Sequence, residues 1–566
     1  MAENKKQMSL IEAQKIKQMM DDPVIWAQIF VTIFDNATKK YTPWTARWYQ
    51  VEMLRDRSIK KVARCGRRTG KCLTGDNLIL DSATGELVTV EEAFNRGFVH
   101  VGTMTDDYKL QAHYTNEIWE NGIKPVYEII TQTGRHIKAT GNHPFFTVEG
   151  WKEIDDLTLN DYVGLANNNQ FFGTDTMRKD ELKLLAYMIG DGNCTNSTIR
   201  FSSINPKHIQ EMKNICDSLN CEMIQYDYNS NCDFNIVKKY NRNNKTYPNP
   251  IKELLIEHDI YGKNAFNKSI PKKIFKLQKK LVAMFLNRLY ATDGWATVSN
   301  GKRQIGYCSV SLQLIEDIQH LLLRFGINSR IEKKTHAYTL SIYDSKNAKL
   351  FCEQIGIYGK EEAINSVLNS CKNVKSDLIP NQIHYKVFEH MQSKNLYQKD
   401  LCIDKNERVR KESNITKDKL LQYASILDNE DLIALANTDI IFDKIVSIKY
   451  IGEEMTYDVA VSLTNNFIAN DFVTHNTETM CIEMLWKAFT KPMHRILVVT
   501  PYETQVRLIF TRLNEIINES PLVKKELKRV TKNPYWIEFN NGAIICGFTT
   551  GASSGSGGAS IRGQRA

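Results

Sequence analysis

The sequence predicts a multidomain protein in which an all-β domain is interrupted by an α+β domain, with both inserted into a partial α/β domain. Three observations support this fold class. RCGRRTGK, at 64–71, begins a phosphate-binding loop, but the hydroxyl residue expected after its lysine comes only at Thr477. Alternating apolar and polar residues, typical of strands, lie at both ends of the intervening stretch. Within that stretch, two apolar segments end in the same Asp-Gly pair.

The composition restricts the possible fold and function classes only broadly. A chain of 566 residues should form several domains, because single cores rarely exceed roughly 250–300 residues. The net charge of +9 and the pI near 8.7 permit nucleic-acid binding, but they are equally typical of a mildly basic enzyme. The 12 cysteines form no CxxC pair, and there is no secretory signal or long apolar run. We therefore expect a reducing cytoplasm and no membrane association.

Residues 1–60 are expected to be helical, because IWAQIFVTIF has apolar residues at helical spacing. Gln50 ends the aromatic-rich segment PWTARWYQ, which resembles the adenine-contacting segment of helicase-like ATPases. A packed amphipathic helix is the alternative for this segment. SIKKVARC then predicts a short strand that leads into the phosphate loop.

In the loop, Gly66 and Gly70 would let backbone N–H groups converge on phosphate oxygens, and Lys71 would neutralise the outer phosphates. Thr477 becomes the neighbour of Lys71 once the interruption is removed, and its hydroxyl would bind the Mg²⁺ of ATP–Mg. Cys65 stands where the motif usually has its first glycine. This departure weakens the motif alone, and the restored threonine strengthens it.

The pattern of apolar and polar residues changes at Cys72. Four segments follow in order: a β-patterned 72–173, a helix–strand alternation in two similar halves over 174–365, a polar segment with helical stretches over 366–438, and a second β pattern over 439–476. After Thr477 we expect the amphipathic helix CIEMLWKAFT, the buried strand HRILVVTP and a hairpin turning at Asn541-Gly542.

The ends of the inserted stretch carry residues suited to self-excision. The stretch begins with Cys72, ends with His475-Asn476, and is followed by Thr477. Its two β-patterned segments resemble an intein of the Hint β fold. This resemblance implies that the Cys72 sulfur attacks the carbonyl of Lys71 and that Thr477 takes over the acyl group. Asn476 would then cyclise with help from His475, and no cofactor would be needed.

Two internal segments resemble further intein blocks. In TGNHPF, Thr140 would hold the scissile amide and His143 would protonate its nitrogen; the alternative is a turn with an exposed histidine. In TYDVAV, Asp458 would help to control Cys72, or it is an ordinary strand carboxylate. Asn465 stands where the family usually has histidine, so cyclisation could be slower or lean on His475.

ELKLLAYMIGDGNC and LVAMFLNRLYATDGWAT resemble the two motifs of LAGLIDADG homing endonucleases. A lone Asp-Gly after a helix is a common capping turn, but two copies point to a pair of packed helices. The resemblance implies that Asp191 and Asp293 bind Mg²⁺, that Lys268 stabilises charge near the cut, and that the sheets bind double-stranded DNA at the intein-less gene. It also implies a monomeric endonuclease.

The flanks, 1–71 and 477–566, resemble the ATPase half of a phage terminase large subunit in ILVVTPYETQVRLIF and ASIRGQRA. The resemblance implies ATP–Mg binding after splicing, phage DNA and the packaging machinery as partners, and a location in the host-cell cytoplasm. No acidic Walker B strand is present, so we expect an incomplete ATPase. A helicase-like ATPase is the rival for the flanks.

Together these resemblances predict an all-β Hint splicing domain, interrupted by an α+β LAGLIDADG endonuclease domain, with both inserted in a partial α/β P-loop ATPase domain. Residues 366–438 could extend DNA recognition or only link the domains. Two alternatives remain for the whole chain: an ATPase with a purely structural insertion, and an insertion that binds DNA without cutting it.

Overall fold

The chain forms two compact units, residues 1–70 with 476–566 and residues 71–475. The computed structural model describes residues 20–35, 40–43, 72–97, 99–115, 117–167, 170–195, 198–226, 232–240, 248–371, 377–401, 413–461, 464, 466–475, 479–500, 503–532 and 535–549. Within these residues, no helix has the length and apolarity needed to cross a membrane. The predictions for Gln50, Gly66, Gly70, Lys71, Asn465, Asn476 and Thr477 lie outside the described residues.

The unit formed by the two flanks is built on a four-stranded sheet in the order β26-β29-β28-β27. Its described elements are α2 (Pro23–Phe30), β1 (Thr32–Asp35), β2 (Lys40–Pro43), α17 (Thr479–Thr490), β26 (Arg495–Thr500), α18 (Glu503–Glu519), α19 (Pro521–Lys525), β27 (Leu527–Lys532), β28 (Tyr535–Phe539) and β29 (Ile544–Thr549). β26 and β29 are parallel, and the other neighbours are antiparallel. The predicted helix, strand and hairpin after Thr477 are confirmed, and Gly542 turns the hairpin with a φ of +81°.

The prediction of continuous helix over IWAQIFVTIF is wrong. Helix α2 ends at Phe30, and β1 pairs antiparallel with β2. The run of β-branched residues from Val31 to Ile33 explains the change, because branching at Cβ favours extended backbone. Trp26 of α2 packs on Phe489 of α17 with ring centroids 5.2 Å apart, so residues far apart in sequence share this small core.

In the second unit, we call residues 72–166 together with 440–475 the β-rich domain. Its main sheet takes the order β11-β10-β25-β12-β23-β3-β9-β8, and β24 pairs with β25. Its elements are β3 (Leu73–Thr74), β4 (Leu78–Leu80), β5 (Leu87–Thr89), α4 (Val90–Arg96), β6 (His100–Met104), β7 (Leu110–Tyr114), β8 (Glu117–Thr131), β9 (His136–Thr140), β10 (Pro144–Thr147), β11 (Gly150–Glu153), the 3-10 turn Ile154–Asp156, β12 (Tyr162–Ala166), β23 (Ile440–Ala460), β24 (Asn466–Ala469) and β25 (Phe472–His475). Strands from both ends of the inserted stretch therefore share one sheet.

The long strands β8 and β23 form the spine of this sheet. They pair antiparallel from Glu117 opposite Ala460 to Thr131 opposite Ile445, with three register shifts. Such bulges bend and twist a strand pair, which lets the ribbon curve over the core. A buried apolar cluster that includes Val163, Phe145 and Phe472 fills the inside.

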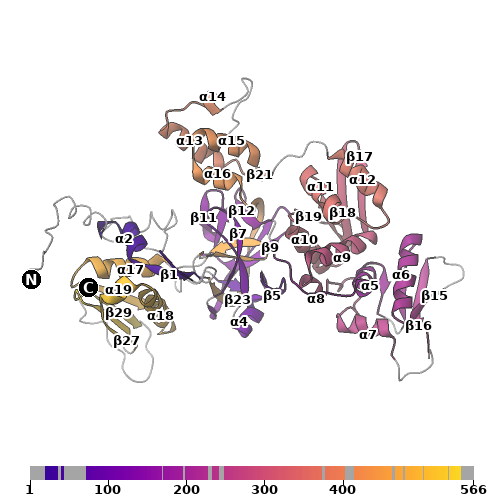
Figure 1. Cartoon of the computed structure of the whole chain (residues 1–566), viewed down its shortest axis with the longest axis horizontal. Coiled ribbons are helices and arrows are strands. Elements are labelled where there is room, and N and C mark those ends of the chain that lie inside the picture. The colour runs from indigo at the N-terminus through magenta and orange to yellow at the C-terminus, as the bar shows by residue number, and fades with distance from the viewer. Residues whose placement is uncertain are drawn as a thin grey trace, which may run out of the picture. The chain divides into compact units, whose positions relative to one another are not determined.

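We call residues 179–370 the two-repeat domain, because each half has a helix, a four-stranded antiparallel sheet and a second helix (Figure 1). The first half contains α5 (Lys179–Gly190), β13 (Gly192–Asn193), β14 (Ile199–Ser202), α6 (Pro206–Ser218), β15 (Cys221–Gln225), β16 (Asp233–Lys238) and α7 (Pro250–Glu257). The second contains α8 (Lys272–Phe275), α9 (Lys279–Ala291), β17 (Gly294–Ser299), β18 (Lys302–Ser309), α10 (Leu312–Arg324), β19 (Arg330–Lys333), β20 (Tyr338–Ile342), α11 (Ser345–Gln354) and α12 (Glu361–Ser370). The internal repeat expected from the sequence is present.

The predicted close packing of α5 against α9 is confirmed at Gly190. A Cβ atom at this position would collide with the side chain of Thr292. Charges also join the halves, since Glu211 of α6 pairs with Arg288 of α9 at 2.8 Å and with Lys183 of α5 at 2.8 Å. These partners and the Tyr187 hydroxyl lower the pKa of Glu211 to about 2, against the effect of burial.

A separate group of short elements, which we call the helical subdomain, covers residues 377–436. It consists of β21 (Leu378–Ile379), α13 (Ile383–Ser393), α14 (Gln398–Leu401), β22 (Ile415–Thr416), α15 (Lys417–Leu427) and α16 (Glu430–Ala436). These elements share a buried cluster that includes Val387, Leu420 and Leu432, and Val148 of the β-rich domain belongs to the same cluster. The helical stretches expected within 366–438 are confirmed by α13 and α15.

Helix α10 belongs to two cores at once. Ile315, Ile318 and Leu322 pack inside the two-repeat domain. Leu323, fully buried, packs instead in the core of the β-rich domain. Because one rigid helix supplies side chains to both cores, the two domains fit together as one packed body at this helix.

Candidate functional site

Cys72, which directly precedes β3, is held by Thr140 at the end of β9. The Cys72 amide donates to Thr140 Oγ1 at 3.2 Å, and the Thr140 amide donates to the Cys72 carbonyl at 3.0 Å. β3 and β9 are antiparallel neighbours, with Leu73 opposite Ala139. This pairing brings together residues 68 positions apart in sequence. The nitrogen held by Thr140 belongs to the Lys71–Cys72 bond, the one predicted to break.

The Cys72 sulfur is buried and contacts two polar side chains from β8. Asn121 Nδ2 lies 2.9 Å from Sγ, and Lys124 Nζ lies 3.1 Å from it. Burial and the charge of Asp458 raise the pKa of Cys72 to about 11, while the Lys124 ammonium acts in the opposite direction. The thiol form is therefore favoured at neutral pH.

Sequence reasoning missed Asn121 and Lys124. The segment ENGIK, residues 120–124, did indicate an irregular strand, because Asn-Gly inside a strand pattern indicates a bulge. Gly122 has a φ of +78°, and its carbonyl accepts a bond from the Thr456 hydroxyl at 2.8 Å. This irregular backbone aims both polar side chains at the sulfur.

His143 and Asp458 are both buried in the β-rich domain. His143 has no exposed surface, so the alternative of an exposed turn histidine is wrong. Its amide donates to the Thr140 carbonyl at 2.8 Å, and its ring packs on Phe145 with centroids 5.2 Å apart. Asp458, on β23 opposite Trp119, is 8% exposed and acts on Cys72 through its charge.

The C-terminal end of the inserted stretch approaches along β25, which ends at His475. β24 and β25 form a hairpin whose turn residues, Asn470 and Asp471, have φ values of +45° and +69°. Asn470 fixes the turn, since its side chain accepts from the Leu78 amide at 2.5 Å and donates to the His136 carbonyl at 3.0 Å. The backbone leading to His475 is thus anchored at its start.

A buried charge cluster holds the same turn. Asp471 accepts from Arg135 Nε at 3.4 Å and pairs with His320 Nδ1 at 2.8 Å. These two partners hold the pKa of Asp471 below its usual value despite its burial. Arg135 belongs to the β-rich domain, whereas His320 lies on α10. The two-repeat domain therefore supplies a polar partner to the turn that precedes His475.

A second polar site lies at the paired ends of α5 and α9. Asp191 caps α5 and is half-buried, and Asp293 follows the cap of α9 and is exposed. Burial and the nearby Asp293 charge raise the pKa of Asp191 to about 7. The two carboxylates therefore interact, on a side that is open to solvent.

Two lysines flank this pair in matching positions. Lys268 Nζ donates to the carbonyls of Gly190 and Gly192, each at 3.0 Å. Lys360 Nζ donates to the carbonyls of Thr292 and Gly294 at 3.2 and 2.5 Å. Each lysine thus bridges the residues on either side of one aspartate. Sequence reasoning named Lys268 and missed Lys360, although the internal repeat implied a counterpart.

The donor set at this site suits a hard divalent cation. Carboxylate oxygens are the ligands that Mg²⁺ prefers, and Asp191 would supply them together with Asp293. Two interacting carboxylates of like charge are destabilised when both ionise, and a cation between them removes that cost. Bound there, Mg²⁺ would polarise a phosphodiester and its attacking water.

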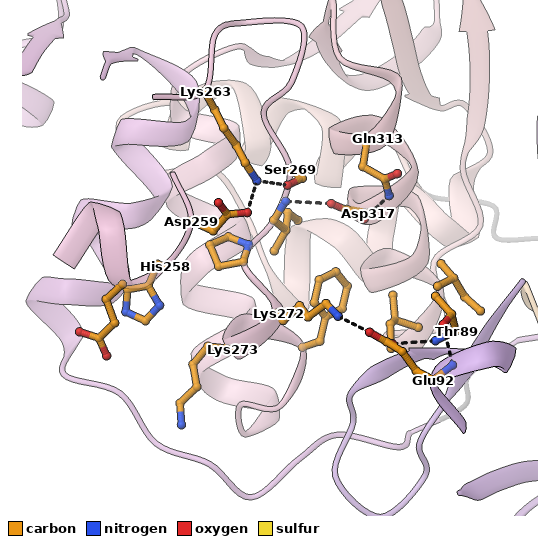
Figure 2. Close-up of a pocket in the computed structure, with 16 residues that line it drawn as sticks. Thr89, Glu92, His258, Asp259, Lys263, Ser269, Lys272, Lys273, Gln313 and Asp317 are labelled. Carbon is orange, nitrogen blue, oxygen red and sulfur yellow. Dashed lines mark hydrogen bonds and ion pairs between the residues drawn. The ribbon is translucent and has the colours of Figure 1, made fainter. Parts of the chain in front are cut away.

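A cavity of about 460 Å³ lies apart from both of these sites, between the β-rich and two-repeat domains (Figure 2). Lys272 pairs across it with Glu92 at 2.9 Å, and Lys263 pairs with Asp259 at 2.7 Å. Asp317, on its wall, accepts from the Ile270 amide at 2.8 Å. Its polar groups are paired with one another, which indicates a domain seam.

Comparison with known families decides what the β-rich domain is. The model of the intein splicing domain matches residues 78–476. The chain belongs to the intein splicing family. We use the word intein below for residues 72–476, which contain the matched range.

The chain is also similar to several individual proteins. The replicative DNA helicase DnaB of Synechocystis is 28% identical over 449 residues, covering 74% of this chain and 51% of its own length. A solved mutant of the Ssp DnaB mini-intein covers 72% of this chain and 99% of its own, at 14% identity and a TM-score of 0.23. The N-terminal LAGLIDADG domain of WhiA covers 33% of this chain and 89% of its own, at 17% identity and a TM-score of 0.23. The chain spans about half the length of the DnaB relative.

Proposed function

We propose that the intein excises itself and joins Lys71 to Thr477. The observation that carries this proposal is how Cys72 is held: its thiol is buried directly before β3, and its amide nitrogen is bonded to Thr140. An amide resists attack unless it is held in a reactive geometry and its nitrogen is protonated as it leaves. Thr140 supports the first requirement, and His143, buried just after it, is suited to the second.

The later steps follow from the residues at the C-terminal junction. The Thr477 hydroxyl takes the acyl group from the Cys72 sulfur, and the Asn476 side-chain amide then attacks its own carbonyl and cuts the chain. His475, at the end of β25, assists this cyclisation. The ester at Thr477 finally rearranges to an amide.

Expression of the whole chain followed by mass spectrometry tests this proposal. The expected products are residues 72–476 as one piece and residues 1–71 joined to 477–566. The double variant Cys72→Ala, Asn476→Ala should remain intact, because it lacks both the first nucleophile and the cyclising amide. Intact wild-type chain alone, or joined flanks from the double variant, would refute the assigned chemistry.

We propose further that the two-repeat domain is a LAGLIDADG-type endonuclease that cuts double-stranded DNA at the intein-less junction of its gene. The support is the paired helix ends, where Asp191 and Asp293 interact and Lys268 and Lys360 flank them in matching positions. Each half also has a four-stranded sheet, a shape suited to a DNA groove. This endonuclease would act as a monomer, because the chain contains both halves of the site.

A plasmid that carries the uninterrupted Lys-Thr coding junction is the substrate for the test. The excised intein with Mg²⁺ should cut it once, and Asp191→Asn or Asp293→Asn should abolish cutting. Asp217→Asn, on the exposed end of α6, is the matched control and should cut normally. Binding of this DNA without cutting by the wild type would favour a module that has lost its nuclease.

For the flanks, we propose a P-loop ATPase of the terminase large-subunit type, acting in the cytoplasm of a phage-infected cell on phage DNA with the packaging machinery. The parallel pair β26 and β29, with α17 beginning at Thr479, is consistent with a phosphate loop that leads into a helix. A helicase-like ATPase is the alternative. The DnaB relative does not decide between them, because the 74% of this chain that it covers is close to the share made up by the intein.

A further inference from the structure

Lys124 lies outside the set of residues expected to act on Cys72. It sits on β8, 52 positions from Cys72 in sequence, and its Nζ is 3.1 Å from the sulfur. Its neighbour on the same strand, Asn121, approaches the sulfur with an amide N–H at 2.9 Å. Both contacts come from donors, and a donor favours the negatively charged form of a sulfur atom. These two contacts therefore favour a thiolate.

Other features of the site disfavour that thiolate. The sulfur is buried, and Asp458, on β23, places a like charge near it. Of the charged groups that act on Cys72 from the strands packed around it, Asp458 opposes ionisation and Lys124 favours it. Nucleophilic attack needs the thiolate, so a cation in contact with the sulfur bears directly on the first step.

We propose that Lys124 is a catalytic residue of the splicing reaction, whose ammonium group stabilises the Cys72 thiolate as it attacks the Lys71 carbonyl. This inference rests on the proposed splicing function. It assigns the positive charge at the sulfur to one residue, and it gives Asn121 a supporting role as a neutral donor.

The step balances without any outside reagent. Cys72 Sγ loses its proton, and the sulfur forms a bond to the carbonyl carbon of Lys71. The bond between that carbon and the Cys72 nitrogen breaks, and the nitrogen gains one proton, so the thiol proton is replaced by an amine proton. Lys124 keeps its protons throughout; it lowers the energy of the charged sulfur and does not act as the base.

The experiment isolates this step in the whole chain. In an Asn476→Ala, Thr477→Ala background, only the thioester can form, and an excess of dithiothreitol releases residues 1–71. We expect Lys124→Met to slow this release by about tenfold, because an opposite charge at this distance lowers a pKa by about one unit or more. Lys124→Arg should restore most of the rate, since it restores the charge.

Lys138→Met is the matched control. Lys138 lies on β9 of the same domain, and its ammonium pairs with Asp76 at 2.7 Å. This variant should release residues 1–71 at the parent rate, and all variants should show melting temperatures close to the parent's.

Two results would overturn the inference: a Lys124→Met variant as fast as the parent, or a folded Lys124→Arg variant as slow as Lys124→Met. The first would mean that the contact has no effect on the rate, and the second that charge is not what matters. Failure of the parent itself to release residues 1–71 would instead overturn the splicing proposal, and this inference with it.

Discussion

At the scale of single residues, Cys72 combines a reactive role with surroundings that keep it unreactive. Burial and Asp458 raise its pKa to about 11 from an ordinary value of 9.0. The thiol is therefore stabilised in the folded chain at every pH below about 9, and this stabilisation is lost as pH rises from 9 to 11. A nucleophile held in this way resists unwanted oxidation and attack before the scissile bond is positioned.

This raised pKa predicts a steep pH dependence for the first step of splicing. Between pH 6.5 and 9, the thiolate fraction should rise about tenfold per pH unit, because the whole range lies below the pKa. Release of residues 1–71 from the Asn476→Ala, Thr477→Ala chain, measured with saturating dithiothreitol, should follow the same slope. A plateau near pH 8 would contradict a pKa of about 11.

At the scale of secondary structure elements, α10 links the two-repeat domain to the β-rich domain. Glu316 and Gln319 contact the hairpin between β8 and β9, at 3.2 Å to His136 and 2.9 Å to the Thr133 carbonyl. His320 pairs with Asp471 in the turn before β25. A helix from the two-repeat domain therefore braces the strand that leads to the C-terminal splice junction.

Replacing His320 with alanine should remove the contact between α10 and the turn before β25. Asp471 would keep its contact with Arg135 but lose the shorter contact with His320. Loss of a partner by a buried polar group destabilises the fold by about 1–3 kcal/mol. We expect a melting temperature lower by several degrees and slower release of residues 477–566 from a Cys72→Ala chain. Leu312→Ala, at the exposed start of the same helix, is the control. Unchanged stability and release rate in His320→Ala would show that the brace has no effect.

Sequence patterns found the elements far better than they found the contacts between them. The repeat, the helix after Thr477 and the Asn541-Gly542 hairpin follow from local periodicity and turn chemistry, and all are present. Local periodicity failed where apolar spacing suited both helix and strand, as in β1. For Lys124 the ENGIK pattern indicates a bulge but not the contact with Cys72, because that contact is set by the register of β8 against β23 and β9. Lys360 was within reach, since the repeat implied a second lysine.

At the scale of the whole molecule, the proposed phosphate loop and the intein exclude each other. In the proposed ATPase, Lys71 and Thr477 would both be needed for ATP–Mg, and in the sequence the intein separates them. The predictions for these residues lie outside the described structure and remain predictions.

This separation predicts that only the spliced flanks bind ATP–Mg tightly. The Cys72→Ala, Asn476→Ala precursor should show no tight binding of a fluorescent ATP analogue, whereas the joined flanks from the wild type should bind it in the presence of Mg²⁺. Tight binding by the precursor would contradict the prediction. A joined Lys71→Ala product serves as the negative control.

The burial of Leu323 in the core of the β-rich domain has a consequence for engineering. A shortened intein made by deleting the two-repeat domain would lose a core leucine, leave a cavity, and strip Asp471 of His320. Removing a buried leucine costs about 2–5 kcal/mol. A working minimal version should therefore keep the segment around α10, or fill the cavity with a larger side chain and retain Asp471 as the partner of the buried Arg135.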